Sequence, residues 1–143
     1  KAVTFFNQQK VQFVLHAGDF VAPFAALRMK KLACDWRGVF GNNDGEKEGL
    51  LQASQGRISG APLRLELAGR TIVMVHDITQ LSLASEKAAL IVCGHTHTPR
   101  IEAHGSRLLV NPGECSGWLN GASTVAVADL ASLSATLHTL AMV

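Results

Sequence analysis

The sequence has little net charge, few cysteines and no long apolar segment. Charged residues make up 17% of the 143 residues and the formal net charge is +2, so neither a nucleic-acid surface nor a disordered chain is expected. Three cysteines, Cys34, Cys93 and Cys115, form no Cys-x-x-Cys motif. This argues against a disulfide framework and favours a reducing compartment, with the cytoplasm as the default. No run approaches the ~20 apolar residues of a membrane span, and no secretory segment follows Lys1.

Internal repeats, low-complexity tracts and charge blocks are also absent, and glycine and proline are spread without forming a linker. A chain of 143 residues, of which 48% are hydrophobic, can bury most of its apolar surface in one core. We therefore expect a single domain over residues 1–143.

Helical and strand patterns alternate in the first part of the chain and give way to paired strands after residue 60. The predicted helices cover residues 1–9, 23–31, 46–52 and 80–88. The predicted strands cover residues 11–16, 36–40, 63–67, 71–75, 89–93, 101–103, 107–110, 124–129 and 135–141, of which 63–67 and 71–75 form a hairpin. This order predicts an α/β fold in which two packed sheets are flanked by helices.

Metal-ligand side chains follow directly on four predicted strands. Asp19 follows residues 11–16, Asn42 follows 36–40, His76 follows 71–75, and His95 and His97 follow 89–93. In open α/β sheets, ligands gather beyond the carboxyl ends of the strands, so we expect these five side chains to meet. Imidazole is the commonest metal ligand near neutral pH, and a mixed nitrogen and oxygen shell suits Mn, Fe, Zn, Ni or Co. Two such cations, roughly 3.5 to 4 Å apart, need a bridging carboxylate, and Asp19 fits that role.

These residues resemble a known family. Four of the five sequence blocks of the calcineurin-like metallophosphoesterases are similar to Gly18-Asp19, Gly41-Asn42-x-Asp44, His76 and Gly94-His95-x-His97. The loop of their small prokaryotic phosphodiesterase branch resembles Asn111-Pro112-Gly113-Glu114-Cys115. The resemblance runs over nearly the whole chain and implies a four-layer αββα sandwich.

The resemblance also implies a dinuclear metal-dependent phosphodiesterase acting through a metal-activated hydroxide on a small phosphorylated substrate. Asp19 would bridge two divalent transition-metal ions, Mn, Ni, Fe or Zn, whereas Asn42, His76 and His95 would complete the second metal site. His97 would belong to the first site. Catalysis would depend on His95, Asn42 and Asp19.

Three departures from the family pattern bear on this hypothesis. The opening Asp-x-His strand of the family has no counterpart here, and we expect about twenty residues to be missing ahead of Lys1. Asn43 stands where many relatives carry a histidine that protonates the leaving oxygen, and an amide cannot act as a general acid. This favours diesters with good leaving groups. Asp77 stands where relatives usually carry a glycine after the metal-binding histidine. Its carboxylate would either repel phosphate or orient a neighbouring group.

Alternative interpretations stay open at several positions. A non-catalytic scaffold, as in the similar eukaryotic proteins of the retromer coat, and a metal-storing or metal-sensing module are the rival functions. Asp44 is a helix cap or an acceptor that orients a ligand, and His16 is buried or supports a ligand. Glu114 and Cys115 close the rim of the site or form a structural turn. Trp118 and the β-rich tail are candidates for a homo-oligomer contact.

Overall fold

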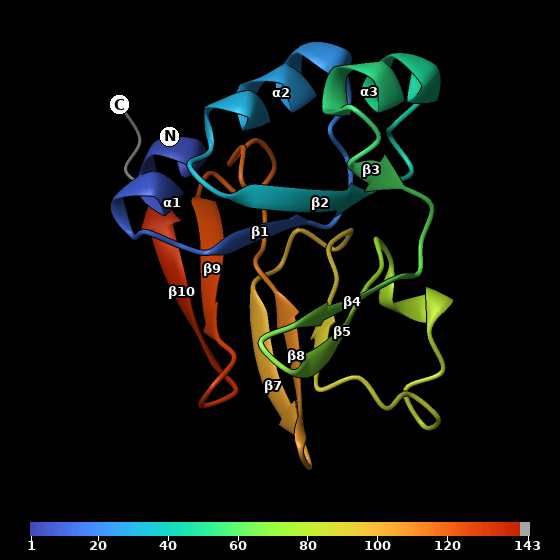
Figure 1. Cartoon of the computed structure of the whole chain (residues 1–143), viewed down its shortest axis with the longest axis vertical. Coiled ribbons are helices and arrows are strands. Elements are labelled where there is room, and N and C mark those ends of the chain that lie inside the picture. The colour runs from blue at the N-terminus through green and yellow to red at the C-terminus, as the bar shows by residue number, and fades with distance from the viewer. Residues whose placement is uncertain (141–143) are drawn as a thin grey trace.

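A parallel sheet of three short strands lies beneath two helices in Figure 1. This computed structural model describes residues 1–140. The strands β1 (Phe13–His16), β2 (Asp35–Val39) and β3 (Ile58–Ser59) pair in the order β1-β2-β3. Because parallel neighbours need a crossover connection, a helix stands between each strand and the next.

The crossover helices form the outer layer over this sheet. Helix α2 (Pro23–Arg28) continues into the 3-10 helix η1 (Met29–Lys31) between β1 and β2, and α3 (Lys47–Ser54) lies between β2 and β3. Pro23 begins α2, where the missing N–H of proline costs no hydrogen bond. Between helices and sheet lies a core of Val14, Phe20, Ala26, Trp36, Leu50 and Ile58, against which Phe6 of α1 (Ala2–Gln8) packs.

A second sheet of five strands lies below the first. Its order is β4-β5-β6-β8-β7, and the central strands β5, β6 and β8 are parallel. The strands are β4 (Leu63–Leu67), β5 (Arg70–Met74), β6 (Leu90–Val92), β7 (Arg100–His104) and β8 (Arg107–Asn111). In Figure 1, β1 and β2 run across the view, whereas β7 and β8 run nearly vertically.

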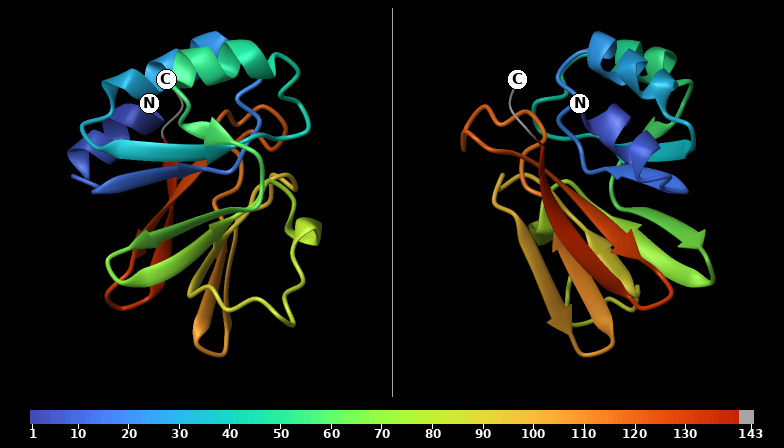
Figure 2. Two further views of the ribbon diagram at one scale, coloured as in Figure 1. Left: turned by 45° about the vertical axis from the view of Figure 1, so that its right-hand side comes forward. Right: turned by 90° about the vertical axis from the view of Figure 1, so that its left-hand side faces the viewer.

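Strand β6 is buried on both faces and contributes side chains to the hydrophobic clusters on the two sides of its sheet. Leu90 and Val92 point into the core between the two sheets, where Val39 of β2 also lies. Ile91 points the other way, onto a cluster closed by Ile78, Leu81 and Leu83. The antiparallel hairpin of β9 (Ser123–Asp129) and β10 (Ser134–Leu140) runs alongside the five-stranded sheet in Figure 2 and adds apolar contacts to the core between the sheets.

The predicted α/β class is confirmed, and so are most predicted elements. The predicted helix over residues 80–88 is wrong, because only the 3-10 helix η2 (Ile78–Gln80) forms there. Leu81 and Leu83 both pack on the core, and a spacing of two residues fits extended chain rather than a helix face. The short strand β3 was not predicted, and residue 141 of the last predicted strand lies outside the described residues. No helix within residues 1–140 combines the length and apolarity needed to cross a membrane.

Candidate metal centre

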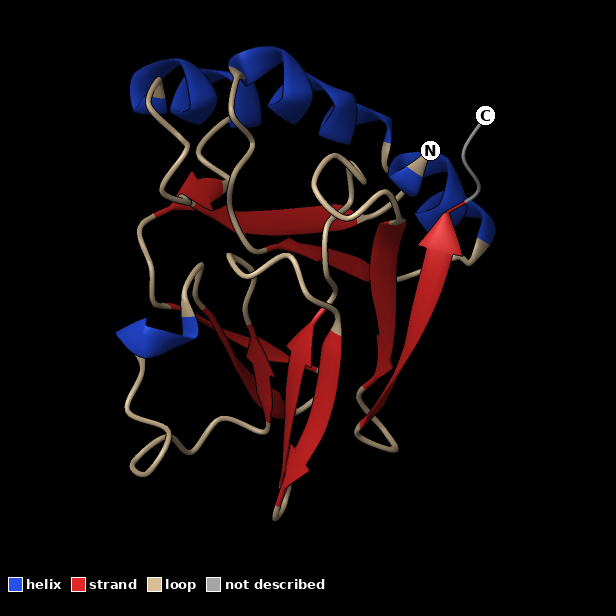
Figure 3. Cartoon of the chain, turned by 180° about the vertical axis from the view of Figure 1, so that it is seen from behind, coloured by secondary structure: helices blue, strands red, loops and turns tan. Residues whose placement is uncertain are grey.

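The two pairs of adjacent parallel strands place four of the five predicted ligands close together. Asp19 and Asn42 follow β1 and β2 of one sheet, and His76 and His95 follow β5 and β6 of the other. Figure 3 shows the loops that follow the strands gathered below α2 and α3. The juxtaposition is therefore a consequence of the strand order, since parallel neighbours end at the same edge of a sheet.

The amide oxygen of Asn42 lies at the centre of this cluster. Asn42 Oδ1 is 2.7 Å from His76 Nε2 and 3.0 Å from His95 Nδ1, and the two ring nitrogens are 3.3 Å apart. Asp19 Oδ2 is 3.6 Å from His76 Nε2. Within residues 1–140, no three His, Cys, Asp or Glu side chains form a metal site by themselves, so a metal centre here would need Asn42 as a further donor.

The hydrogen bonding of His76 decides what the cluster can hold. The carbonyl oxygen of Ala17 lies 2.7 Å from His76 Nδ1 and can only accept, so Nδ1 carries the proton. His76 Nε2 therefore faces the Asn42 and Asp19 oxygens. Ligands about 2 Å from one tetrahedral ion lie about 3.3 Å apart. The separations of 3.3 Å between the two ring nitrogens and 3.6 Å between Asp19 and His76 are near this spacing, whereas the 2.7 Å contact of Asn42 with His76 has the length of a hydrogen bond.

Two glycines let the Asp19 turn approach the second sheet closely. Gly18 has a φ of +101°, and a Cβ there would lie 2.6 Å from His76 Nδ1. A Cβ on Gly41 would overlap the Asp19 carboxylate. Asp19 has a φ of 60°, which is uncommon for a non-glycine residue, so its side chain is held in place at the expense of backbone strain.

Asp44 holds this turn from beneath. Its buried carboxylate accepts the backbone N–H groups of Asp19 at 3.0 Å, Val21 at 2.7 Å and Gly41 at 2.7 Å. Of the two open interpretations, the structure supports an acceptor that orients a ligand. Asn43 completes the support, because its backbone N–H and its side-chain amide each donate to the Asp19 carboxylate at 2.9 Å.

His16 also supports the Asp19 turn and is not one of the candidate ligands. Its ring stacks on Phe20 with centroids 3.8 Å apart, and Nδ1 accepts the N–H of Gly18 at 3.3 Å. Burial lowers the pKa of His16 to about 4, so the ring stays neutral and able to accept.

Asp77 lies beside the exposed side of the cluster. Its carboxylate accepts the N–H of Thr79 at 2.9 Å, which lowers the pKa of Asp77, and Oδ2 is 3.7 Å from His95 Nε2. The His95 side chain is 42% exposed, against 6% for His76. The cluster thus opens to solvent on the side of His95 and Asp77.

Comparison with known proteins places this architecture in a family. Residues 1–133 match the calcineurin-like phosphoesterase superfamily domain. The chain belongs to this superfamily. It is 31% identical over 137 residues to the phosphodiesterase MJ0936 of Methanocaldococcus jannaschii, which covers 90% of this chain and 82% of that protein. The structure of an archaeal phosphodiesterase superposes with a TM-score of 0.86 at 28% identity, covering 97% of this chain and 89% of that one.

Two further structures, at lower identity, share the fold alone. The phosphoesterase YfcE of E. coli gives a TM-score of 0.64 at 19% identity and covers 94% of this chain and 87% of its own. Zinc-complexed Vps29 of Entamoeba histolytica gives a TM-score of 0.64 at 17% identity, with coverage of 97% and 87%.

The fifth predicted ligand, His97, stands apart from the other four in its contacts. Its Nδ1 is 3.6 Å from Glu114 Oε2, and its backbone carbonyl accepts the Asn120 side chain at 2.8 Å. Within the described residues, no hydrogen bond or ion pair joins the His97 imidazole to Asp19, Asn42, His76 or His95. Its assignment to a first metal position stays a prediction.

Two residues of the Asn-Pro-Gly loop contribute more than the sequence indicated. Asn111 donates to the carbonyl of Gly94 at 2.8 Å and to Thr96 Oγ1 at 3.0 Å, and so holds the turn that carries His95. The Glu114 carboxylate is buried, which by itself would raise its pKa, but hydrogen bonds from Ser116 and the following backbone hold the pKa at about 2. The position of Asn111 at the end of β8, parallel to β6, was the available signal.

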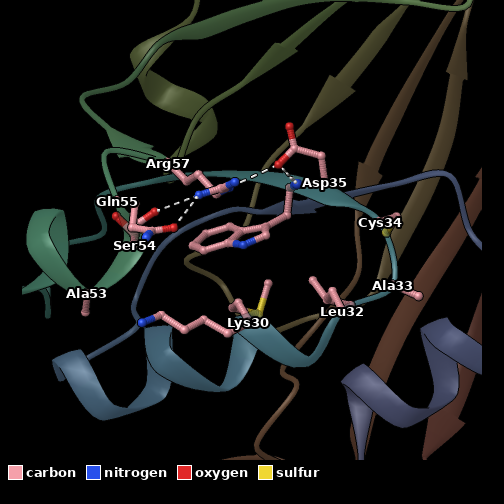
Figure 4. Close-up of a pocket in the computed structure, with 11 residues that line it drawn as sticks. Lys30, Leu32, Ala33, Cys34, Asp35, Ala53, Ser54, Gln55 and Arg57 are labelled. Atoms are coloured by element: carbon pink, nitrogen blue, oxygen red, sulfur yellow. Dashed lines mark hydrogen bonds and ion pairs between the residues drawn. The ribbon is translucent and has the colours of Figure 1, made fainter.

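A cavity of about 440 Å³ lies at the opposite end of β2 and contains none of the predicted ligands. Figure 4 shows Arg57 among the residues that line it, where the guanidinium contacts Asp35 at 3.0 Å and Gln55 at 3.2 Å. Asp35 begins β2 and Asn42 follows its end, so the strand separates this cavity from the candidate centre.

Proposed function

We propose that this chain is a metal-dependent phosphodiesterase acting on small phosphodiesters. The observation that carries the proposal is the convergence of metal-ligand side chains on one point. His76 Nε2, the amide oxygen of Asn42 and a carboxylate oxygen of Asp19 face one another, and these atom types are ones that a divalent transition-metal cation accepts as ligands. Family membership and the 31% identity to a phosphodiesterase support the same activity.

The donors suit two transition-metal ions such as Mn, Ni, Fe or Zn. Asn42, His76 and His95 would hold one ion, Asp19 would bridge, and His97 would contribute to the other. When bound, a pair of divalent cations lowers the pKa of water to supply hydroxide and screens the charge of a phosphoryl group. The protein's part is to fix the donors, and the bonds from Asp44 and Asn43 fix Asp19.

Asn43 narrows the substrate class. Its amide is engaged with Asp19 and offers no acidic proton to a leaving oxygen. An aryl diester, whose leaving group departs as a stable anion, should therefore be hydrolysed far better than an alkyl monoester. Comparable turnover of the two substrates would contradict this preference.

A generic aryl phosphodiester, bis(p-nitrophenyl) phosphate, with Mn²⁺ or Ni²⁺ added, tests the activity. Asp19→Ala and Asn42→Ala should lower kcat/KM by about 10²-fold or more, because each removes a donor that the cations require. His104→Ala is the matched control, since His104 is a surface histidine paired with Glu102. Turnover that persists in Asp19→Ala and Asn42→Ala would overturn the proposal.

A non-catalytic binding protein is the second candidate. Trp118 and Leu119 are 86% and 66% exposed, and Phe24 is 71% exposed, as in surfaces that contact other proteins. Stoichiometric Mn²⁺ binding without turnover would favour this candidate or a metal-sensing module over the enzyme.

A further inference from the structure

Helix α2 has a line of apolar side chains exposed to solvent. Val21, Phe24 and Leu27 are 61%, 71% and 44% exposed. Residues three apart are neighbours on a helix surface, so Phe24 and Leu27 share one face of α2, and Val21 extends the line just before the helix begins. The opposite face of α2 packs on the core through the fully buried Ala26. In Figure 2, no other part of residues 1–140 covers the side of α2 that faces away from the sheet, so this apolar line can contact a partner.

Charges of opposite sign lie at the two ends of the apolar line. The 3-10 helix η1 follows α2 directly, so Arg28 and Lys31 lie at the C-terminal end. At the other end, the first residue of α2 contacts α3, because a Cβ on Gly49 would lie 2.9 Å from the Cγ atom of that proline. Glu46 and Glu48 belong to the same end of α3. Within the described part of the chain, none of these four charged side chains forms an ion pair.

This distribution of charge distinguishes between partners. An anionic membrane or a nucleic acid would be attracted to Arg28 and Lys31 but repelled by Glu46 and Glu48. A second copy, related by a twofold axis through the apolar line, brings the acidic end of each copy to the basic end of the other and joins the two apolar lines. We infer that this face of α2 and α3 binds a second copy of the chain, with the charged ends setting the orientation of the two copies. The inference does not depend on the proposed function, since neither metal nor substrate takes part.

Sedimentation velocity of the full chain at increasing protein concentration tests for this dimer. Wild-type protein should shift from one chain to two, and added salt should weaken the association because it screens exposed charges. Phe24→Ser removes an apolar side chain from both copies, so the Kd of self-association should rise by about 100-fold or more. Trp118→Ser is the matched control, because it removes another exposed aromatic side chain, from the loop between β8 and β9, and should leave the Kd unchanged.

Reversal of the charges tests the orientation of the two copies. The double variants Arg28→Glu/Lys31→Glu and Glu46→Lys/Glu48→Lys should each be monomeric, because like charges then meet at both ends of the interface. An equimolar mixture of the two variants should form a mixed dimer, since each end again meets its opposite.

Three results would overturn the inference. The first is wild-type protein that stays monomeric at every concentration, and cosedimentation of that monomer with phosphatidylglycerol vesicles would assign the face to a lipid surface instead. The second is a dimer that persists in Phe24→Ser but dissociates in Trp118→Ser, which would place the interface on the loop between β8 and β9. The third is a mixture of the two charge-reversed variants that stays monomeric although circular dichroism shows both to be folded.

Discussion

Replacement of Asp44 by alanine tests whether the Asp19 turn is held by a single buried carboxylate. Asp44 is 2% exposed and accepts three backbone N–H groups, those of Asp19, Val21 and Gly41. A hydrogen bond to a charged acceptor contributes about 1.5 to 3 kcal/mol. Asp19 and Val21 also have φ values of 60° and 69°, so part of the loss is recovered when the turn relaxes. We expect Asp44→Ala to lower the free energy of unfolding by about 3 to 4 kcal/mol.

Urea unfolding of the metal-free protein, followed by circular dichroism, measures this loss. Asp44→Asn keeps the shape but only one acceptor oxygen, so its loss should be smaller, about 2 kcal/mol. Asp35→Ala is the control, because the Asp35 side chain is 55% exposed and its pair with Arg57 should contribute less than about 1 kcal/mol. If Asp44→Ala destabilises no more than Asp35→Ala, Asp44 does not hold the turn and the reasoning is refuted.

Two further substitutions test Gly18, in the Asp19 turn, and Glu86, in the segment that precedes β6. Gly18→Ala should destabilise by more than about 2 kcal/mol in the same urea assay, because its Cβ would meet His76 and its φ is +101°, whereas Gly45→Ala, with nothing within 4 Å, should have little effect. The hydrogen bond from Arg64 is the main reason that the pKa of Glu86 falls from 4.5 to about 2. Its contribution to stability is therefore present above pH 4.5 and lost as the pH falls toward 2. Glu86→Gln should flatten stability across that pH range, and an unchanged pH profile would count against the pair.

The sequence predicted those parts of the site that depend on strand order. Asp19, Asn42, His76 and His95 each follow an apolar strand, and the rule that ligands gather at carboxyl ends was enough to expect their meeting. The pairing of His97 with Glu114 could not be predicted, because it depends on how residues 114–120 fold back on themselves. The role of Asp44 was left open for a similar reason, since a cap and a loop-spanning acceptor have the same sequence pattern.

The missed elements also have a physical explanation. Residues 80–88 have helix-forming composition, but Leu81 and Leu83 gain more by packing together on the core beside Ile91 than a helix would allow. Strand β3 has two residues, too few for any periodic signal, and forms because Ile58 fills the core beneath α2 and α3. In both cases tertiary packing overrode the local pattern.

The strands follow the usual hydrophobic pattern, whereas the turns after β1 and β6 have an unusual backbone that also carries candidate ligands. Strand β6 is apolar and buried on both faces, as a central strand should be. Directly after β1 and β6, Asp19, Val21, His95 and His97 all have positive φ values, which L-residues adopt at a cost. Between the strand ends, the ring nitrogen of His76 and the side-chain oxygens of Asn42 and Asp19 face one another. A positive φ alone does not mark a ligand site, because Ala68 and Leu133 also have one in hairpin turns, whereas its combination with converging ligand side chains supports the proposed metal centre.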